Sequence, residues 1–221
     1  MRVLIIGLVM VLLTSCSLVR SNVTVFSQIS PNDIHGKKIA ILPNPLSLIN
    51  SLEFATYKAK LTPRFQKIGF NVVNNPNEAD FLAEVHYGID KGRMVTQTYS
   101  TPIYGQTGGG TTVESGTISN NYGGVGSYSG MSQTTPTYGM VGSSIGSQNV
   151  SLYTRFLEID IVDRRSVTRK QNVNLYEGRV ISTGTCPSLA GVFDPMSKAL
   201  FKNFFAENGS SRTVRIFGGR C

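Results

Sequence analysis

Apolar residues recur along this chain with two different periods, and each change of period marks an expected element. Residues 38–42 form a mostly apolar run, which predicts a buried strand. Over residues 51–68 the apolar spacing becomes three and four, which predicts a helix that ends at Gly69 and is kinked or broken at Pro63. Residues 79–87 alternate again, which predicts a half-buried strand.

The second half of the chain predicts a hairpin, a helix and a last strand. Residues 149–163 and 173–182 are strand candidates separated by a polar turn, and residues 212–216 are a further strand candidate. Between them, Val192, Met196, Leu200 and Phe204 are spaced by four, as on one face of a helix. With weaker candidates added, we expect an α+β fold of two layers: a mostly antiparallel sheet of about six strands with two helices on one face.

The N-terminus has the order of a bacterial secretion signal. Arg2 precedes the apolar run 3–13, and two small residues separate that run from Cys16. This arrangement resembles a lipobox, so we expect residues 1–15 to be a signal peptide and Cys16 to be lipidated. The run is shorter than the roughly 20 apolar residues of a membrane-spanning helix. The alternative is an ordinary signal peptide with a cysteine near its end by chance.

Lipidation of Cys16 predicts where the protein resides. Several acyl chains anchor a protein stably where one chain is marginal, so palmitate on Cys16 would hold the chain on the lipid bilayer. Ser17, in place of aspartate, favours the outer membrane facing the periplasm over the inner membrane. We expect residues 16–37 to form the lipidated N-terminus and a tether with a short strand, followed by one α+β domain made of residues 38–99 and 149–221.

Residues 100–148 differ in composition from the rest of the chain. Between residues 101 and 150, glycine accounts for 12 positions and serine and threonine for 8 each, while Glu114 is the only charged residue. We therefore expect a flexible, low-complexity loop inserted between two strands. Its tyrosines suggest partner binding, since tyrosine supplies contact area at low entropic cost; the alternative is a passive loop. These tyrosines are Tyr104, Tyr122, Tyr128 and Tyr138.

Charge and cysteine content agree with an envelope location. The full chain carries 21 basic and 13 acidic residues, and the excess is consistent with an anionic envelope polymer as a partner, or with an envelope protein. The alternative is a solvated, mixed surface that keeps the protein soluble. Nucleic acid is a poor partner for a protein outside the cytosol. Cys186 and Cys221 form an even pair that an oxidising periplasm favours as a disulfide; two free thiols or an intermolecular bridge are the alternatives.

No set of residues specifies a reaction, and we expect no catalytic residue, metal site or cofactor. The sequence Gly142-Ser143-Ser144-Ile145-Gly146 has the form of a nucleophile elbow, but no histidine follows Ser144. His35 and His86 are far apart and lack further ligands at zinc spacing. Glu158, Asp160 and Asp163 are better explained as the solvent face of a strand and its turn than as paired catalytic carboxylates.

Several short motifs between residues 38 and 216 are shared with one family. They are Gly69-Phe70, Ala79-Asp80-Phe81-Leu82, residues 157–163, Leu175-Tyr176-Glu177-Gly178-Arg179 and Leu200-Phe201-Lys202-Asn203-Phe204. In these positions the chain resembles bacterial envelope lipoproteins of the domain of unknown function 4136 family. It departs from them before Gly178, where members often have Trp and this chain has Tyr176-Glu177. The resemblance implies location and fold more than activity.

The expected function is that of a membrane-anchored cell-envelope lipoprotein with a non-catalytic binding or structural role. A second hypothesis is an accessory lipoprotein subunit of a secretion or surface-appendage assembly that docks through the tyrosine-containing insert. A hydrolase acting on envelope polymers is a weaker third hypothesis, because no nucleophile, base and orienting group can be assembled from the sequence.

Overall fold

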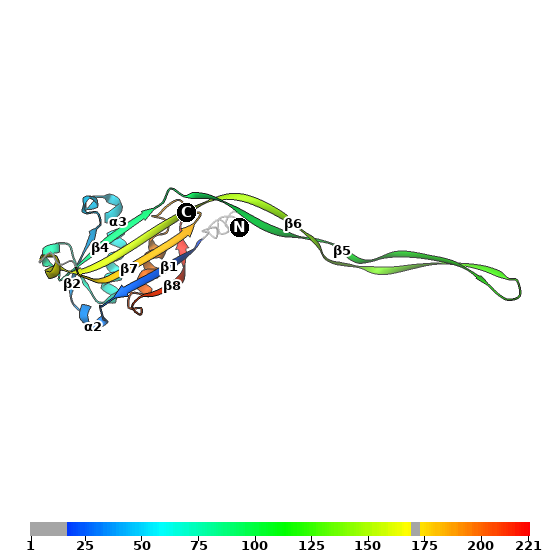
Figure 1. Cartoon of the computed structure of the whole chain (residues 1–221), viewed down its shortest axis with the longest axis horizontal. Helices are drawn as coiled ribbons and strands as arrows, with labels where there is room; N and C mark the ends of the chain where they lie inside the picture. The colour runs from blue at the N-terminus through cyan, green and yellow to red at the C-terminus, as the bar shows by residue number, and fades with distance from the viewer. Residues whose placement is uncertain (1–16, 169–172) are drawn as a thin grey trace, which may run out of the picture. The chain divides into compact units, whose positions relative to one another are not determined.

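The structure is a computed structural model that describes residues 17–168 and 173–221 of the 221-residue chain. These residues divide into two compact units. The first unit comprises the described residues up to Met94 together with those from Ser151 onward, and the second unit is Val95–Val150. The first unit is a sheet with helices packed on it, and the second is a two-stranded ribbon (Figure 1).

The sheet of the first unit follows the order β3-β2-β4-β6-β7-β1-β8, and β5 pairs with β6 outside this path. The first and last strands of the chain are therefore neighbours. The strands are β1 (Ser17–Ser27), β2 (Lys38–Pro43), β3 (Asn71–Val73), β4 (Phe81–Ile89), β5 (Arg93–Ser119), β6 (Val125–Asp163), β7 (Asn174–Gly184) and β8 (Ser210–Gly219).

Most of the pairing is antiparallel, as the sequence predicts. β2 runs parallel to both β3 and β4, whereas β4–β6, β6–β7, β7–β1 and β1–β8 are antiparallel. The predicted hairpin of the second half is present, with Phe156 opposite Ile181 and Ile159 opposite Gly178. This pairing places residues that are far apart in the sequence on the same face of the sheet.

The number of elements exceeds the prediction. The sheet has 8 strands, and the described residues include four α-helices, so the expectation of about six strands and two helices is matched only roughly. The helices are α2 (Pro31–Ile34), α3 (Leu52–Ile68), α4 (Arg164–Thr168) and α5 (Phe193–Lys202), with 3-10 turns at η2 (Leu46–Leu48) and η3 (Pro76–Glu78). The additional helices α2 and α4 have only 4 and 5 residues, too few for a recognisable apolar period.

Helix α3 forms where the period predicts it. The Ser51 hydroxyl accepts a hydrogen bond from Phe54 N, and Gly69 ends the helix with a φ of 115°. A break at Pro63 does not occur, because the helix is continuous through this residue. The buried side chains of Leu61 and Phe65, on either side of Pro63, hold both halves against the same core, which offsets the missing backbone hydrogen bond.

One continuous core lies between the sheet and the two longer helices. Ile159, Ile161 and Val180 from the sheet pack in the same cluster as residues of α3 and α5. Aromatic contacts join the layers: Tyr57 of α3 stacks on Phe193 of α5 at 3.9 Å between ring centroids, and Tyr176 of β7 stacks on Phe204 at 4.2 Å. The opposite side of the sheet, which we call the open face, carries the alternate side chains of the same strands.

The N-terminal segment is more ordered than a tether. Ser17–Ser27, assigned from the sequence to a tether with a short strand, is the 11-residue strand β1. It pairs with β7 on one side and with β8 on the other, and its Val23 and Val25 are buried in the core. The folded unit therefore includes Ser17–Ser27 as well as the residues from Lys38 onward.

Candidate functional site

The second unit is a long antiparallel ribbon made of β5 from Val95 onward and β6 as far as Val150. Its two strands are joined by side-chain hydrogen bonds, as where Thr96 Oγ1 donates to Asn149 Oδ1 at 2.8 Å and Thr107 Oγ1 donates to the Thr137 carbonyl at 3.2 Å. At the tip, Asn120 Oδ1 accepts a hydrogen bond from Gly124 N at 2.8 Å. The segment expected as a loop is thus a β-ribbon.

Glycine in this ribbon accommodates tyrosine instead of acting only as a flexible spacer. A Cβ on Gly116 would lie 2.6 Å from the ring of Tyr128, and a Cβ on Gly146 would lie 2.5 Å from the ring of Tyr99. An aromatic ring that covers a cross-strand glycine stabilises such a pair. Threonine, valine, isoleucine and tyrosine also favour strands. Composition alone indicated a loop because it does not show these cross-strand pairs.

The tyrosines singled out from the sequence all lie on this ribbon and are exposed. Tyr104 belongs to β5, Tyr128 and Tyr138 belong to β6, and Tyr122 lies in the turn between the strands. Their relative exposures range from 53 % to 98 %. Residues 95–150 contain no buried residue and one charged residue, Glu114. The ribbon therefore presents aromatic and hydroxyl groups to solvent without an apolar core of its own.

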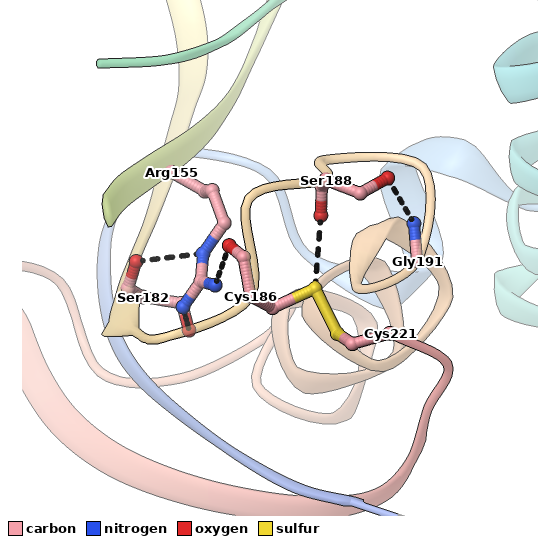
Figure 2. Close-up of a disulfide and its surroundings, with 6 residues drawn as sticks. All are labelled: Arg155, Ser182, Cys186, Ser188, Gly191 and Cys221. Carbon is pink, nitrogen blue, oxygen red and sulfur yellow. Dashed lines mark hydrogen bonds between the residues drawn. A yellow bond between two sulfur atoms is a disulfide. The ribbon is translucent and has the colours of Figure 1, made fainter. Parts of the chain in front are cut away.

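The disulfide considered from the sequence is present in the first unit. Cys186 and Cys221 are bonded, with 5.6 Å between their Cα atoms and a sequence separation of 35. Arg220 N also donates a hydrogen bond to the Gly191 carbonyl at 2.9 Å. Both contacts tie the end of the described chain to the loop before α5, and Figure 2 shows the disulfide.

A buried arginine supports the same loop (Figure 2). Arg155 is only 2 % exposed. Its Nη1 donates to the Cys186 carbonyl at 2.9 Å, and its Nε and Nη2 donate to the Ser182 carbonyl and hydroxyl at 3.2 Å each. Burial lowers the pKa of its guanidinium, and the nearby Asp90 acts in the opposite direction. These acceptors are fixed parts of the chain, so Arg155 has a structural role.

The open face carries a row of carboxylates across three neighbouring strands. Asp160 of β6 lies directly opposite Glu84 of β4 on one side and Glu177 of β7 on the other. Two residues before Asp160 on the same face, Glu158 Oε1 lies 2.7 Å from Arg179 Nε, and this ion pair neutralises the Glu158 carboxylate. Like charges placed directly opposite each other destabilise a sheet, so the row Glu84–Asp160–Glu177 is electrostatically unfavourable.

Asp160 responds to this environment. The pKa of its carboxyl is raised to about 6, mainly by burial and also by the carboxylates of Glu177, Glu158 and Glu84, while Arg179 acts in the opposite direction. The neighbouring row on the same face pairs Leu82 with Val162, which belong to a small second apolar cluster. The acidic residues Glu158, Asp160 and Asp163 were expected to lie on a solvent face, and all three are partly buried.

The other residues considered for catalysis or metal binding do not converge. His86 Nδ1 lies 3.5 Å from Glu158 Oε2, and the His86 ring packs against Phe156. Ser144 lies within strand β6, whereas a nucleophile elbow needs a turn between a strand and a helix. Across residues 17–168 and 173–221, no group of three or more His, Cys, Asp or Glu is placed to hold a metal ion.

Two expectations concern the membrane. Cys16 lies outside the described residues, so its lipidation stays a prediction. Among the helices of the described part of the chain, none has the length and apolar character needed to cross a bilayer.

Comparisons with protein-family models, with curated proteins and with solved structures give no match to this chain.

Sequence reasoning missed two features of the first unit. The acidic row was not recognised because Glu84, Asp160 and Glu177 come together only through the register of three strands. Arg155 was not recognised because its partners are mainly backbone carbonyls, which every residue carries. A single basic residue within the otherwise apolar alternation of 149–163 was the available signal.

Proposed function

We propose that this protein is a membrane-anchored cell-envelope lipoprotein with a non-catalytic binding role, and that the ribbon of residues 95–150 is its docking element. Cys16 would carry the lipid that holds the chain at the membrane. The observation that carries the docking part of the proposal is a long two-stranded ribbon with exposed tyrosines and no buried residue.

The energetics of the ribbon favour a partner. An isolated two-stranded hairpin is marginally stable in water, because both faces and both edges are solvated. Strand edges with free N–H and C=O groups pair readily with another chain. Pro102 and Pro136 interrupt these groups at one position in each strand, which leaves uninterrupted stretches on either side. A partner that covers the ribbon would supply the burial it lacks.

The side chains indicate the chemistry of that partner. With Glu114 as its single charged residue, the ribbon has little electrostatic attraction for an anionic polymer. Its exposed tyrosines offer contact area and hydroxyl groups suited to a protein surface. We therefore favour an envelope protein over an anionic envelope polymer as the occupant of the ribbon.

Site-specific photocrosslinking in cells that make this protein tests the docking element. A photoreactive amino acid at Tyr104, Tyr122 or Tyr138 should give discrete adducts with one envelope protein, and the same group at Lys202 on α5 should not. Replacing the four tyrosines by serine should abolish the adduct formed from Ile103, whereas replacing Thr98, Thr111, Thr117 and Thr134 by serine should preserve it. Absence of adducts from every ribbon position would refute docking through the ribbon.

The anchor is tested separately. Wild-type protein should label with palmitate and fractionate with membranes, and the Cys16→Ala variant should do neither. A Cys16→Ala variant that still labels and still fractionates with membranes would show that Cys16 is not the lipid attachment site.

A further inference from the structure

A corner of the open face, at the start of β1 and the end of β8, combines apolar and basic side chains. Leu18 lies directly opposite Phe217, and Arg20 lies directly opposite Arg215. Leu18 is 48 % exposed and Phe217 is 72 % exposed. We call these four residues the corner patch. Because β8 is the edge strand of the sheet, the patch is accessible from the face and from the side.

The corner patch is unfavourable in water for two independent reasons. Two arginines directly opposite each other in a ladder repel one another, and within the described residues neither guanidinium forms an ion pair. Two large apolar side chains are also placed side by side in solvent, while the intervening Val19 turns into the core. A surface that is both apolar and anionic would remove both penalties.

The position of the corner patch along the chain indicates which surface this is. Leu18 is two residues from Cys16, and a chain of two residues spans at most about 7 Å. If Cys16 is acylated, as the proposed function requires, the patch lies within that reach of the lipid attachment. A bilayer surface then has both required properties, since its acyl boundary accepts apolar side chains and its anionic headgroups attract arginine.

The acidic row does not cancel the charge of the corner patch. Phe26, which lies opposite Glu177, is six residues from Arg20 along β1, or about 20 Å. This separation exceeds the Debye length of about 8 Å at physiological ionic strength. Asp90 lies nearer to Arg20 than this row does, beside Thr154 of β6, with β7 between β6 and β1. Its carboxylate accepts hydrogen bonds from Gly92 N and Thr154 N.

We infer that the corner patch is a membrane-contact site for anionic phospholipid. Leu18 and Phe217 enter the headgroup boundary, while Arg20 and Arg215 bind lipid phosphates. The inference rests on the proposed lipoprotein function for the position of the membrane, but it goes further, because it assigns one side of the folded unit to the bilayer.

Tryptophan fluorescence offers a direct test, because the chain contains no Trp. The full protein, purified from membranes, is reconstituted in vesicles of phosphatidylethanolamine and phosphatidylglycerol brominated on their acyl chains. Bromine should quench the Phe217→Trp variant strongly. The matched control is Phe26→Trp, at the other end of β1 on the same face, which should be quenched at least twofold less. Both sites are exposed, so both variants should retain the wild-type circular dichroism spectrum.

The arginines are tested in the Phe217→Trp background. Each basic residue near an anionic membrane favours membrane contact roughly fivefold. Arg20→Gln with Arg215→Gln should therefore shift the equilibrium away from membrane contact roughly 30-fold and abolish most quenching. Lys67→Gln with Lys202→Gln removes the same charge from α3 and α5 and should leave the quenching unchanged. Phosphatidylcholine vesicles should give weaker quenching than anionic vesicles.

Equal quenching of the Phe217→Trp and Phe26→Trp variants in acylated protein overturns the membrane-contact site and leaves the lipid anchor intact. Mass spectrometry that finds no acyl chain refutes the anchor instead. In that case the same variants are added to the anionic vesicles from solution. Selective quenching of the Phe217→Trp variant still supports the corner patch, and its absence overturns it.

Discussion

Gly178 of β7 lies against the phenol of Tyr176. A Cβ at residue 178 would come within 2.6 Å of Tyr176 Oη and 2.8 Å of Leu200 Cδ1. Because Tyr176 is fixed by stacking on Phe204, it has little freedom to move away. The absence of a side chain at residue 178 is therefore a packing requirement between the sheet and α5.

The first prediction follows from this contact. Gly178→Ala should lower the free energy of unfolding by about 2 kcal/mol, as expected for overpacking a fixed core. Gly130→Ala on the ribbon is the control, since a Cβ there has no neighbour within 4 Å, and it should not destabilise the protein. Urea denaturation followed by circular dichroism measures both. Equal midpoints for Gly178→Ala and wild type would show that the core yields at this position.

The two stacked tyrosines should respond differently to loss of their hydroxyl groups. Tyr176 Oη is buried and has no hydrogen-bond partner among the described residues, so Tyr176→Phe removes an unsatisfied polar group and should leave stability unchanged or raise it by about 1 kcal/mol. Tyr57 Oη donates to Glu53 Oε1 at 2.8 Å, so Tyr57→Phe should cost about 1 kcal/mol. The same denaturation assay compares them, and a loss of stability in Tyr176→Phe would contradict the prediction.

The pKa of Asp160 predicts a pH-dependent stability. Because the folded-state pKa is raised from 3.8 to about 6, the folded protein retains its proton better than the unfolded chain. Stability is thus highest below about pH 4 with respect to this group, and it falls as the pH rises through 6.

Asp160→Asn should remove this dependence. At pH 8 the variant should be more stable than wild type by about 1 kcal/mol, a value reduced by solvent screening at a half-buried position, and near pH 4 the difference should vanish. Urea midpoints across this range provide the measurement. A variant less stable than wild type at pH 8 would show that the ionised carboxylate is favourable there.

The disulfide should contribute substantially to stability. For the sequence separation of 35 between Cys186 and Cys221, chain entropy predicts about 4 kcal/mol. Reductant should lower the urea midpoint of the wild type accordingly. The double variant Cys186→Ser with Cys221→Ser should have the same lowered midpoint with or without reductant. If reductant leaves the wild-type midpoint unchanged, the bond does not stabilise the fold.

Local signals predicted local structure well. The apolar spacing up to Ile68 and the glycine at residue 69 together specified α3, although the break considered at Pro63 does not occur. Alternation placed Phe81, Ala83, Val85 and Tyr87 on one side of a strand, and the structure has the middle two buried and the outer two partly buried. Such signals are sufficient because the residues that decide each element lie within a few positions of one another.

Features that depend on distant pairing were not predictable in this way. The place of β1 depends on partners near residues 180 and 215, and no short pattern encodes them. The ribbon was missed because glycine-rich composition suggests a loop, whereas Gly116 and Tyr128 act as a cross-strand pair. For the candidate site, the sequence identified the exposed tyrosines and the cysteine pair, but not the corner patch, which needs β1 and β8 side by side.

The adjacency of β1 and β8 also constrains how the protein is made. Val25 is paired with Ser210, which lies 185 residues later in the sequence, so this part of the sheet cannot form until residue 210 has been synthesised. Contacts this distant in sequence form slowly. If the chain is exported from its N-terminus, β1 crosses the membrane before its neighbours β7 and β8 have crossed. It would then be unpaired, and this strand would be the segment most in need of a chaperone during export.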